Sequence, residues 1–340
     1  MPTQCLWLWG VVDAEVCLSV AGAFIAIRHG EPGRLASSLA STFSRRYLPQ
    51  ARPVSCYDVP QAVMEWLPGE GFTVESAVFS RNPLEPDYYR VRGGLPEAYV
   101  NESPVFFLLQ VIARSLARRG YALLTDSVAI SDGERAVLLL GYPHTGKSSI
   151  SAIALTQGYR VISTENTVVK PGETYIEVYG GTRVLVFDPR VRELYGVEVR
   201  SSEITRHGYE LVDLDLLDTP RLPQEVVGVY LLYTSFSSTG ASLSPVKGRK
   251  VTKTIWYFAT ALLKGVEYYE PSPLDTPIDG AVASTLTKLL DAFSRGYSNS
   301  FYEAFGSPLE VFKAIVEVSH LRRPGRGASC PPTPPLSGGA

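Results

Sequence analysis

The residues best suited to chemistry form one continuous run of eight: Gly141, Tyr142, Pro143, His144, Thr145, Gly146, Lys147 and Ser148. They match the pattern G-x-x-x-x-G-K-[ST] at every fixed position. Two glycines at this spacing let several backbone N–H groups point at one anion. The lysine can then reach the β- and γ-phosphates of a nucleotide, and the Ser148 hydroxyl can ligate a Mg²⁺ ion that bridges them. The run therefore predicts a binding loop for ATP or GTP with Mg²⁺.

The segments on either side of this run are those that such a loop needs. Residues 136–140 are entirely apolar and predict a buried strand, and residues 149–157 predict a helix. The positive end of that helix would face the phosphates, which adds Ser149 to the cradle. Strand, loop and helix in this order predict an α/β fold with a P-loop nucleoside-triphosphate-binding domain.

A second apolar run, residues 184–187, ends at Asp188. In mononucleotide-binding ATPases an Asp at the end of such a strand holds Mg²⁺ through water. An Asp followed by Pro189 is also a common turn signal, so this position has two interpretations.

The remaining chain divides into three parts. Residues 1–100 predict a smaller N-terminal α+β domain. It would have two strands joined near Asp13 and Glu15, a helix over 35–47, a short helix over 61–66 and a loop over 81–94. Residues 101–321 predict the nucleotide-binding domain, which opens with a helix over 105–119 that Ser103 caps. Residues 322–340 are rich in Pro, Gly and Ser and predict a disordered tail.

Four segments in this order resemble the C-terminal catalytic domain of HPr kinase/phosphorylase, a relative of phosphoenolpyruvate carboxykinase in fold. The first is a pair of strands, over 124–130 and 136–140, followed by the glycine-rich loop. The second is Gly-Tyr-Arg-Val-Ile-Ser-Thr-Glu-Asn at 158–166, and the third is Ile-Glu-Val-Tyr-Gly at 176–180. The fourth is Pro-Val-Lys-Gly-Arg-Lys at 245–250. The resemblance spans residues 103–263 and does not extend to the first hundred residues.

The resemblance implies an ATP- or GTP-dependent phosphotransferase and assigns roles to single residues. Glu165 and Glu177 would join Ser148 in holding Mg²⁺. Arg249, flanked by Lys247 and Lys250, would neutralise the transferred phosphoryl group beside Lys147. The acceptor would be the hydroxyl of an unknown small molecule or protein.

Three positions depart from the family pattern. Thr164 stands where the family has the Asp that transfers the proton, and Thr cannot act as a base near neutral pH. Tyr179 replaces an Arg, and Thr125 stands at the family histidine. Two alternatives follow: a non-catalytic nucleotide-sensing module, or an NTPase that hydrolyses its nucleotide. Convergence of Glu165 and Glu177 on the loop would favour the kinase, and Asp188 beside Ser148 would favour hydrolysis.

A rival motif, Arg28-His29-Gly30-Glu31, follows an apolar strand and resembles the histidine phosphatases, in which that His is the nucleophile. The second histidine that this chemistry needs would be His207. The structural alternative is a turn in which Gly30 and Gly33 reverse the chain.

Composition excludes several classes of protein. The chain of 340 residues has 32 basic and 34 acidic residues, whereas a dedicated nucleic-acid binder is usually strongly basic. The apolar N-terminal stretch is interrupted by Asp13 and Glu15, so we expect neither a signal peptide nor a membrane span. Four widely spaced cysteines predict reduced thiols and a cytoplasmic protein. A homo-oligomer is compatible with all of this.

Overall fold

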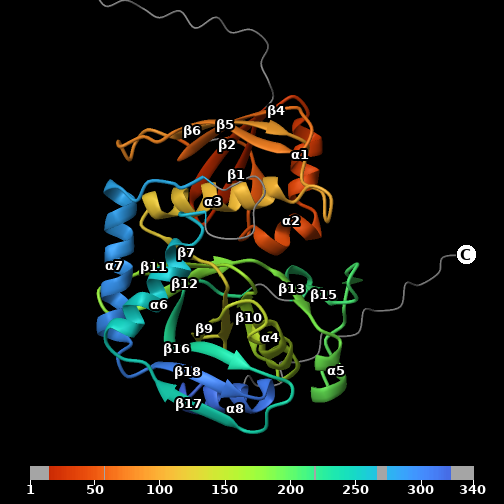
Figure 1. Ribbon diagram of the computed structural model, residues 1–340, viewed down its shortest axis with the longest axis vertical. Helices are drawn as coiled ribbons and strands as arrows, with labels where there is room; N and C mark the ends of the chain where they lie inside the picture. The colour runs from red at the N-terminus through yellow and green to blue at the C-terminus, as the bar shows by residue number, and fades with distance from the viewer. Residues whose placement is uncertain (1–14, 57, 218–219, 266–273, 323–340) are drawn as a thin grey trace, which may run out of the picture.

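The computed structural model describes residues 15–56, 58–217, 220–265 and 274–322. The protein is a mixed α/β structure with two large β-sheets, a small third sheet, and helices between and around them (Figure 1). The expected disordered tail, apart from Arg322, lies outside these residues. Within the described ranges, no helix is both long and apolar enough to cross a membrane.

The first sheet has the strand order β3-β1-β2-β4-β6-β5. Strands β2, β4 and β6 are parallel, and β1, β3 and β5 pair antiparallel at the two sides. Helices α1 (Pro32–Leu39) and α2 (Thr42–Tyr47) connect β2 to β3. The strands are β1 (Glu15–Val20), β2 (Ala23–His29), β3 (Arg52–Val54), β4 (Ala62–Leu67), β5 (Phe72–Val78) and β6 (Asp87–Gly93).

Three predictions for this region are wrong. The segment expected as a short helix is β4, and the expected loop over 81–94 contains β6. The expected helix over 35–47 is two helices that meet at Ser41, whose hydroxyl accepts a hydrogen bond from Ser44 N and so caps α2. Strands β1 and β2 are joined by a hairpin turn at Ala21 and Gly22, both with positive φ. The junction expected near Asp13 and Glu15 lies outside the described residues except for Glu15, the first residue of β1.

The second sheet has the order β10-β8-β9-β16-β12-β11-β7, with β18 beside the second half of β16 and β17 beside β18. Strands β9, β16 and β18 are parallel, so their carboxyl ends share one edge. The strands are β7 (Ala122–Leu124), β8 (Ser127–Ser131), β9 (Arg135–Leu140), β10 (Arg160–Ser163), β11 (Thr167–Pro171), β12 (Ile176–Gly181), β16 (Gln224–Thr234), β17 (Ala241–Pro245) and β18 (Phe301–Gly306).

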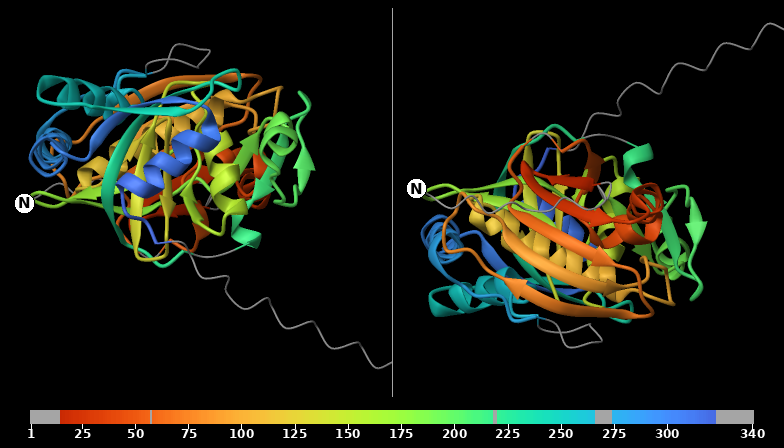
Figure 2. Two further views of the ribbon diagram at one scale, coloured as in Figure 1. Left: turned by 90° about the horizontal axis from the view of Figure 1, so that it is seen from below. Right: turned by 90° about the horizontal axis from the view of Figure 1, so that it is seen from above.

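Both faces of this sheet are buried, which explains the continuous apolar runs of β9 and β16. Alternate residues of β9 contribute to two different cores: Leu138 and Leu140 to one, Val137 and Leu139 to the other. Helices α6 (Arg249–Thr260) and α7 (Gly280–Gly296) pack on the first side. Helices α4 (Lys147–Thr156) and α8 (Pro308–Val318) pack on the second, where α8 crosses the strands (Figure 2, left).

Helix α3 (Ser103–Arg118) lies between the two large sheets (Figure 1). It contacts β2 of the first sheet, β7 of the second, and α7. All its residues except Ser103 and Phe106 are buried, so it is enclosed on all sides. It starts with a proline in its first turn, but no side chain caps it. One apolar core runs from the first sheet through α3 into the second, across the predicted domain boundary near residue 100.

The third sheet pairs β13 (Val184–Phe187) with β15 (Glu210–Asp213), and β15 with β14 (Glu203–Ile204). Helix α5 (Arg190–Tyr195) follows β13, and a 3-10 turn, Leu214–Leu216, follows β15.

The expectation of reduced thiols is wrong for two of the four cysteines, because Cys17 and Cys56 form a disulfide. The register of β3 on β1 sets Val54 opposite Cys17, and this brings residue 56 within reach. Cys5 and Cys330 lie outside the described residues.

Candidate functional site

The glycine-rich loop, Gly141–Ser148, connects the carboxyl end of β9 to the start of α4. Gly146 precedes the helix with φ +95°, a conformation that L side chains rarely adopt. A Cβ at this glycine would lie 1.8 Å from Thr234 Oγ1, at the end of β16. Thr234 donates from both its N and its Oγ1 to the Thr145 carbonyl, at 3.1 and 2.8 Å. The neighbouring parallel strand therefore fixes the loop, and the glycine makes this close approach possible.

Lys147 turns back into the loop and is 6% exposed. Its ammonium donates to the carbonyls of Gly141 and Tyr142, the latter at 3.0 Å, and lies 3.3 Å from Asp126 Oδ1. Asp126 stands between β7 and β8 with φ +49°, and its own carbonyl accepts from Gly141 N. Asp126 was not among the predicted site residues, because it lies fifteen positions before the loop in the sequence. The pairing of β8 with β9 brings it next to the loop in space.

A cavity of about 660 Å³ opens directly on this loop. The loop and the first turn of α4 supply one wall. Residues of the first hundred, of α3 and of the third sheet supply the rest of the lining. The lining includes Arg46, Tyr47, Tyr99, Phe106, Thr125, Asp126, Pro143 to Ser149, Glu165, Asn166, Asp188, Arg190, Thr205, His207, Tyr209, Thr234 and Phe236.

Three carboxylates line the cavity, and each has a basic neighbour. Asp126 lies against Lys147, Glu165 lies 3.7 Å from Arg46 Nη2, and Asp188 lies 2.5 Å from Arg190. The hydrogen bond from Arg190 holds the pKa of Asp188 below its ordinary value. Asp188 is therefore positioned to remain anionic near neutral pH, as a magnesium ligand must be.

These residues fit a Mg²⁺ ion bound together with a nucleotide. Among the described residues, no group of three or more His, Cys, Asp or Glu side chains could hold a metal alone. Mg²⁺ usually keeps several waters and binds through one or two carboxylates plus substrate phosphates, so a three-residue cage is not required. Ser148 and Glu165, both predicted as ligands, line the same cavity as Asp188.

Two predicted site residues lie away from the cavity. Glu177 is on β12, where its carboxylate accepts from the Tyr179 hydroxyl at 3.3 Å. Arg249 is the first residue of α6. Neither lines the cavity, because the register of β12 and the position of α6 carry their side chains elsewhere. Glu165 and Glu177 therefore do not converge on the loop.

The remaining predicted residues divide between the cavity and its surroundings. Pro143, His144, Thr145, Gly146, Lys147, Ser148 and Ser149 line the cavity. Gly141 and Tyr142 do not line it, and the Tyr142 ring packs 5.1 Å from that of Tyr257. Thr164 is 1% exposed and donates to the Val184 carbonyl at 2.8 Å, so it is directed away from the cavity.

The two histidines of the phosphatase motif do not meet in the cavity. His29 is buried, its Nδ1 accepts from Glu31 N at 2.9 Å, and its ring lies against Trp66. His207 lines the cavity and contacts the Tyr99 ring. Strand β2 ends at His29, and the chain passes through Gly30 and Glu31 directly into α1, so Gly33 lies in a helix and not in the expected turn.

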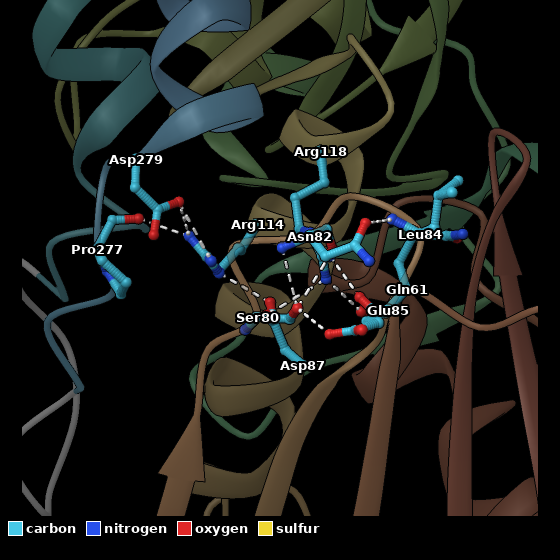
Figure 3. Close-up of polar contacts among 10 residues, drawn as sticks. All are labelled: Gln61, Ser80, Asn82, Leu84, Glu85, Asp87, Arg114, Arg118, Pro277 and Asp279. Carbon is cyan, nitrogen blue, oxygen red and sulfur yellow. Dashed lines mark hydrogen bonds and ion pairs between the residues drawn. The ribbon is translucent and has the colours of Figure 1, made fainter.

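A second polar cluster joins the first sheet to α3 and α7 (Figure 3). Arg114 donates to Asp87 at 2.8 Å and to the Pro277 carbonyl, and it lies 3.4 Å from Asp279. Arg118 lies 3.3 Å from Asp87 and donates to the backbone carbonyls of Gln61, Asn82 and Glu85. Asp87 and Arg114 are fully buried. Carboxylates and backbone carbonyls of the same chain pair with both arginines. We therefore assign the cluster a structural role, in which it holds the first sheet against α3 and α7.

No protein-family model matches this sequence, and no curated protein is detectably similar to it. The function is therefore argued from the site itself.

Proposed function

We propose that this chain binds ATP or GTP on the glycine-rich loop and transfers the γ-phosphoryl group to a hydroxyl acceptor. We also propose that residues 101–321 form a P-loop domain related to HPr kinase. The observation that carries the proposal is that Lys147 and three carboxylates meet on one 660 Å³ cavity, at the start of a helix. Such a cavity is in the size range of small-ligand sites.

Lys147 would bind the β- and γ-phosphates in place of the loop carbonyls that it now contacts. The backbone N–H groups at the start of α4 would hold the same anion. Ser148 with Glu165 or Asp188 would hold Mg²⁺, which neutralises charge on the phosphates. Arg190, which lines the cavity, would supply the further positive charge that was expected from Arg249.

The proton of the acceptor hydroxyl would go to a carboxylate at another position, because Thr164 replaces the Asp that transfers the proton in the family. Thr164 is buried and donates to a carbonyl, so it has no part in this step. Asp126 lines the cavity next to Lys147, where the γ-phosphate would lie. Positioning and charge neutralisation dominate phosphoryl transfer, so a weak base is sufficient.

One observation favours a second candidate, hydrolysis of the nucleotide with water as acceptor. Asp188 ends β13 and lines the cavity with Ser148, as a Mg²⁺-holding Asp in a hydrolysing NTPase would. The distinction rests on the product: orthophosphate forms in hydrolysis, and a phosphate ester forms in transfer.

The thermal unfolding of the wild type and Lys147→Ala, with ATP or GTP and with or without Mg²⁺, tests the proposal. A ligand at a hundred times its Kd adds about 2.7 kcal/mol to the free energy of unfolding, which is a shift of several degrees. We expect a Mg²⁺-dependent rise that Lys147→Ala abolishes. A rise without Mg²⁺ dependence would indicate the non-catalytic module, and no rise with either nucleotide would refute the proposal.

A further inference from the structure

One part of the cavity wall, formed by Arg46 and Asn166, holds two buried polar atoms with unused hydrogen-bonding capacity. Arg46 Nε and Asn166 Oδ1 are both inaccessible to solvent and have no hydrogen-bond partner among the described residues. Asn166 is 3% exposed, and both residues line the cavity. An unpaired buried donor or acceptor costs about 1–3 kcal/mol, so such atoms are uncommon in folded proteins.

These two residues are held in place by their neighbours. Asn166 Nδ2 donates to the Tyr47 carbonyl at 3.0 Å, which leaves its oxygen as the unused group. The Arg46 guanidinium lies 5.0 Å from the centre of the Tyr47 ring, and its Nη2 lies 3.7 Å from Glu165. That separation is too long for a hydrogen bond, so Arg46 can still take an anionic partner. The wall therefore presents a cationic donor beside a neutral acceptor.

We infer that this wall is the acceptor subsite and that the acceptor is a small hydroxylated anion, a carboxylate or phosphate compound with two hydroxyls. Its anionic oxygen would accept from Arg46, and the hydroxyl that is not phosphorylated would donate to Asn166 Oδ1. The inference rests on the proposed function, because the loop at the same cavity must hold the nucleotide. A small acceptor fits better than a folded protein, because it must share a cavity of about 660 Å³ with the phosphates of the nucleotide.

In the transfer step the reactive hydroxyl oxygen of the acceptor forms a bond to the γ-phosphorus, and the bond from that phosphorus to the β,γ-bridging oxygen breaks. The nucleoside diphosphate leaves, and the hydroxyl proton passes to Asp126 and then to solvent. Arg46 and Asn166 bind and orient the acceptor and exchange no proton. Substitution of either residue should therefore weaken acceptor binding and leave the nucleotide in place.

The test uses the full chain with Mg²⁺ and β,γ-imido-ATP, titrated calorimetrically with glycerol 3-phosphate and with D-glycerate. Glycerol lacks the charge and propionate lacks the hydroxyl, so both serve as ligand controls. We expect the two hydroxylated anions to bind more tightly than either control. Arg46→Gln should weaken their binding about ten- to a hundredfold, because it removes a charged hydrogen bond. Asn166→Leu should weaken it as well, and it keeps the test open if Arg46→Gln fails to fold.

Arg45→Gln is the matched control, because Arg45 is the preceding residue of α2 but pairs with Asp213 and Asp215 and does not line the cavity. It should leave binding of the hydroxylated anions unchanged. The nucleotide-dependent rise in melting temperature should persist in Arg46→Gln and disappear in Lys147→Ala, which separates failure of the inference from failure of the proposed function.

The inference is refuted if neither anion binds, or if Arg46→Gln binds them like wild type. Phosphorylation of a serine-containing unstructured peptide in preference to both anions would also refute it.

Discussion

Arg114 and Arg118 on α3 are buried as deeply as Lys147 on α4, yet the two regions satisfy their charges differently. The arginines meet Asp87 and the carbonyls of three separate chain segments, and protein surrounds them (Figure 3). Lys147 meets carbonyls of its own loop and one carboxylate at the edge of a cavity. Depth of burial therefore does not identify a functional cation. A functional cation is better identified by whether a ligand can replace the groups that the cation contacts.

This comparison predicts its largest effect at Arg114. Arg114→Met should lower the free energy of unfolding by about 3–5 kcal/mol, because it leaves buried Asp87 with Arg118 as its remaining cationic partner. Urea denaturation would measure the loss. Asp87→Asn in the same chain should recover part of it, since the uncompensated charge is then removed. Folded Arg114→Met should still be stabilised by ATP with Mg²⁺. Lys147→Ala should not show this stabilisation. A loss below about 1 kcal/mol in Arg114→Met would contradict the structural role of the cluster.

A smaller effect is expected from two glycines with similar backbone angles. Gly146 and Gly158 have φ +95° and +88°, but only Gly146 has a neighbour where its Cβ would be: Thr234 Oγ1 at 1.8 Å. Gly158→Ala should cost about 1–2 kcal/mol from backbone strain alone. Gly146→Ala should cost about 1–3 kcal/mol more from the close contact.

Thermal unfolding of both variants, with and without nucleotide, would measure this difference. Gly146→Ala should also lose the nucleotide response, and Thr234→Ala in the same chain should restore part of the stability. Equal stabilities for the two alanine variants would show that β16 does not fix the loop.

The smallest predicted effect concerns acid and the Arg45–Asp213 pair beside the site. Burial acts to raise the pKa of Asp213, but hydrogen bonding and the charge of Arg45 bring it below its ordinary value. A carboxyl whose pKa is lowered by folding stabilises the protein at neutral pH. That stabilisation is lost as the pH falls below about 4, the ordinary Asp value, through the lower folded-state pKa.

Arg45→Gln should therefore cost about 1 kcal/mol at neutral pH and reduce the acid sensitivity of the unfolding free energy. Urea unfolding at neutral pH and below the ordinary Asp pKa would measure both quantities. An unchanged acid dependence would mean that Arg45 does not set the protonation of Asp213.

The sequence predicted correctly those elements whose residue pattern lies within one short stretch of the chain. The apolar strand, the glycine-rich segment and the following helix are adjacent in the chain, and β9, the loop and α4 occupy those positions. Prediction failed at β4, where Val63 is buried on the same face as exposed Glu65 and so interrupts the alternation typical of a strand. It failed at β6 although alternate residues are buried there, because flanking Pro, Asn and Gly residues indicated a loop.

The candidate site shows the same limit at longer range. Glu165 was found because it adjoins a motif, but Glu177 and Arg249 were placed at the site by resemblance and lie elsewhere. Arg46 and Asn166 meet on one wall across 119 intervening residues, and neither carries a local signal. Only the packing of the first sheet and α3 against the second sheet brings them together.

The burial of α3 on all sides also has a consequence for synthesis of the chain. The strands of the first sheet are translated before α3, which packs on β2, so their apolar core stays incomplete until residue 118 has been added. The helix itself needs β7 and α7, and α7 ends at Gly296. An apolar core shared in this way cannot be completed one half at a time on the ribosome. The early strands must therefore be kept from aggregating while most of the protein is still being made.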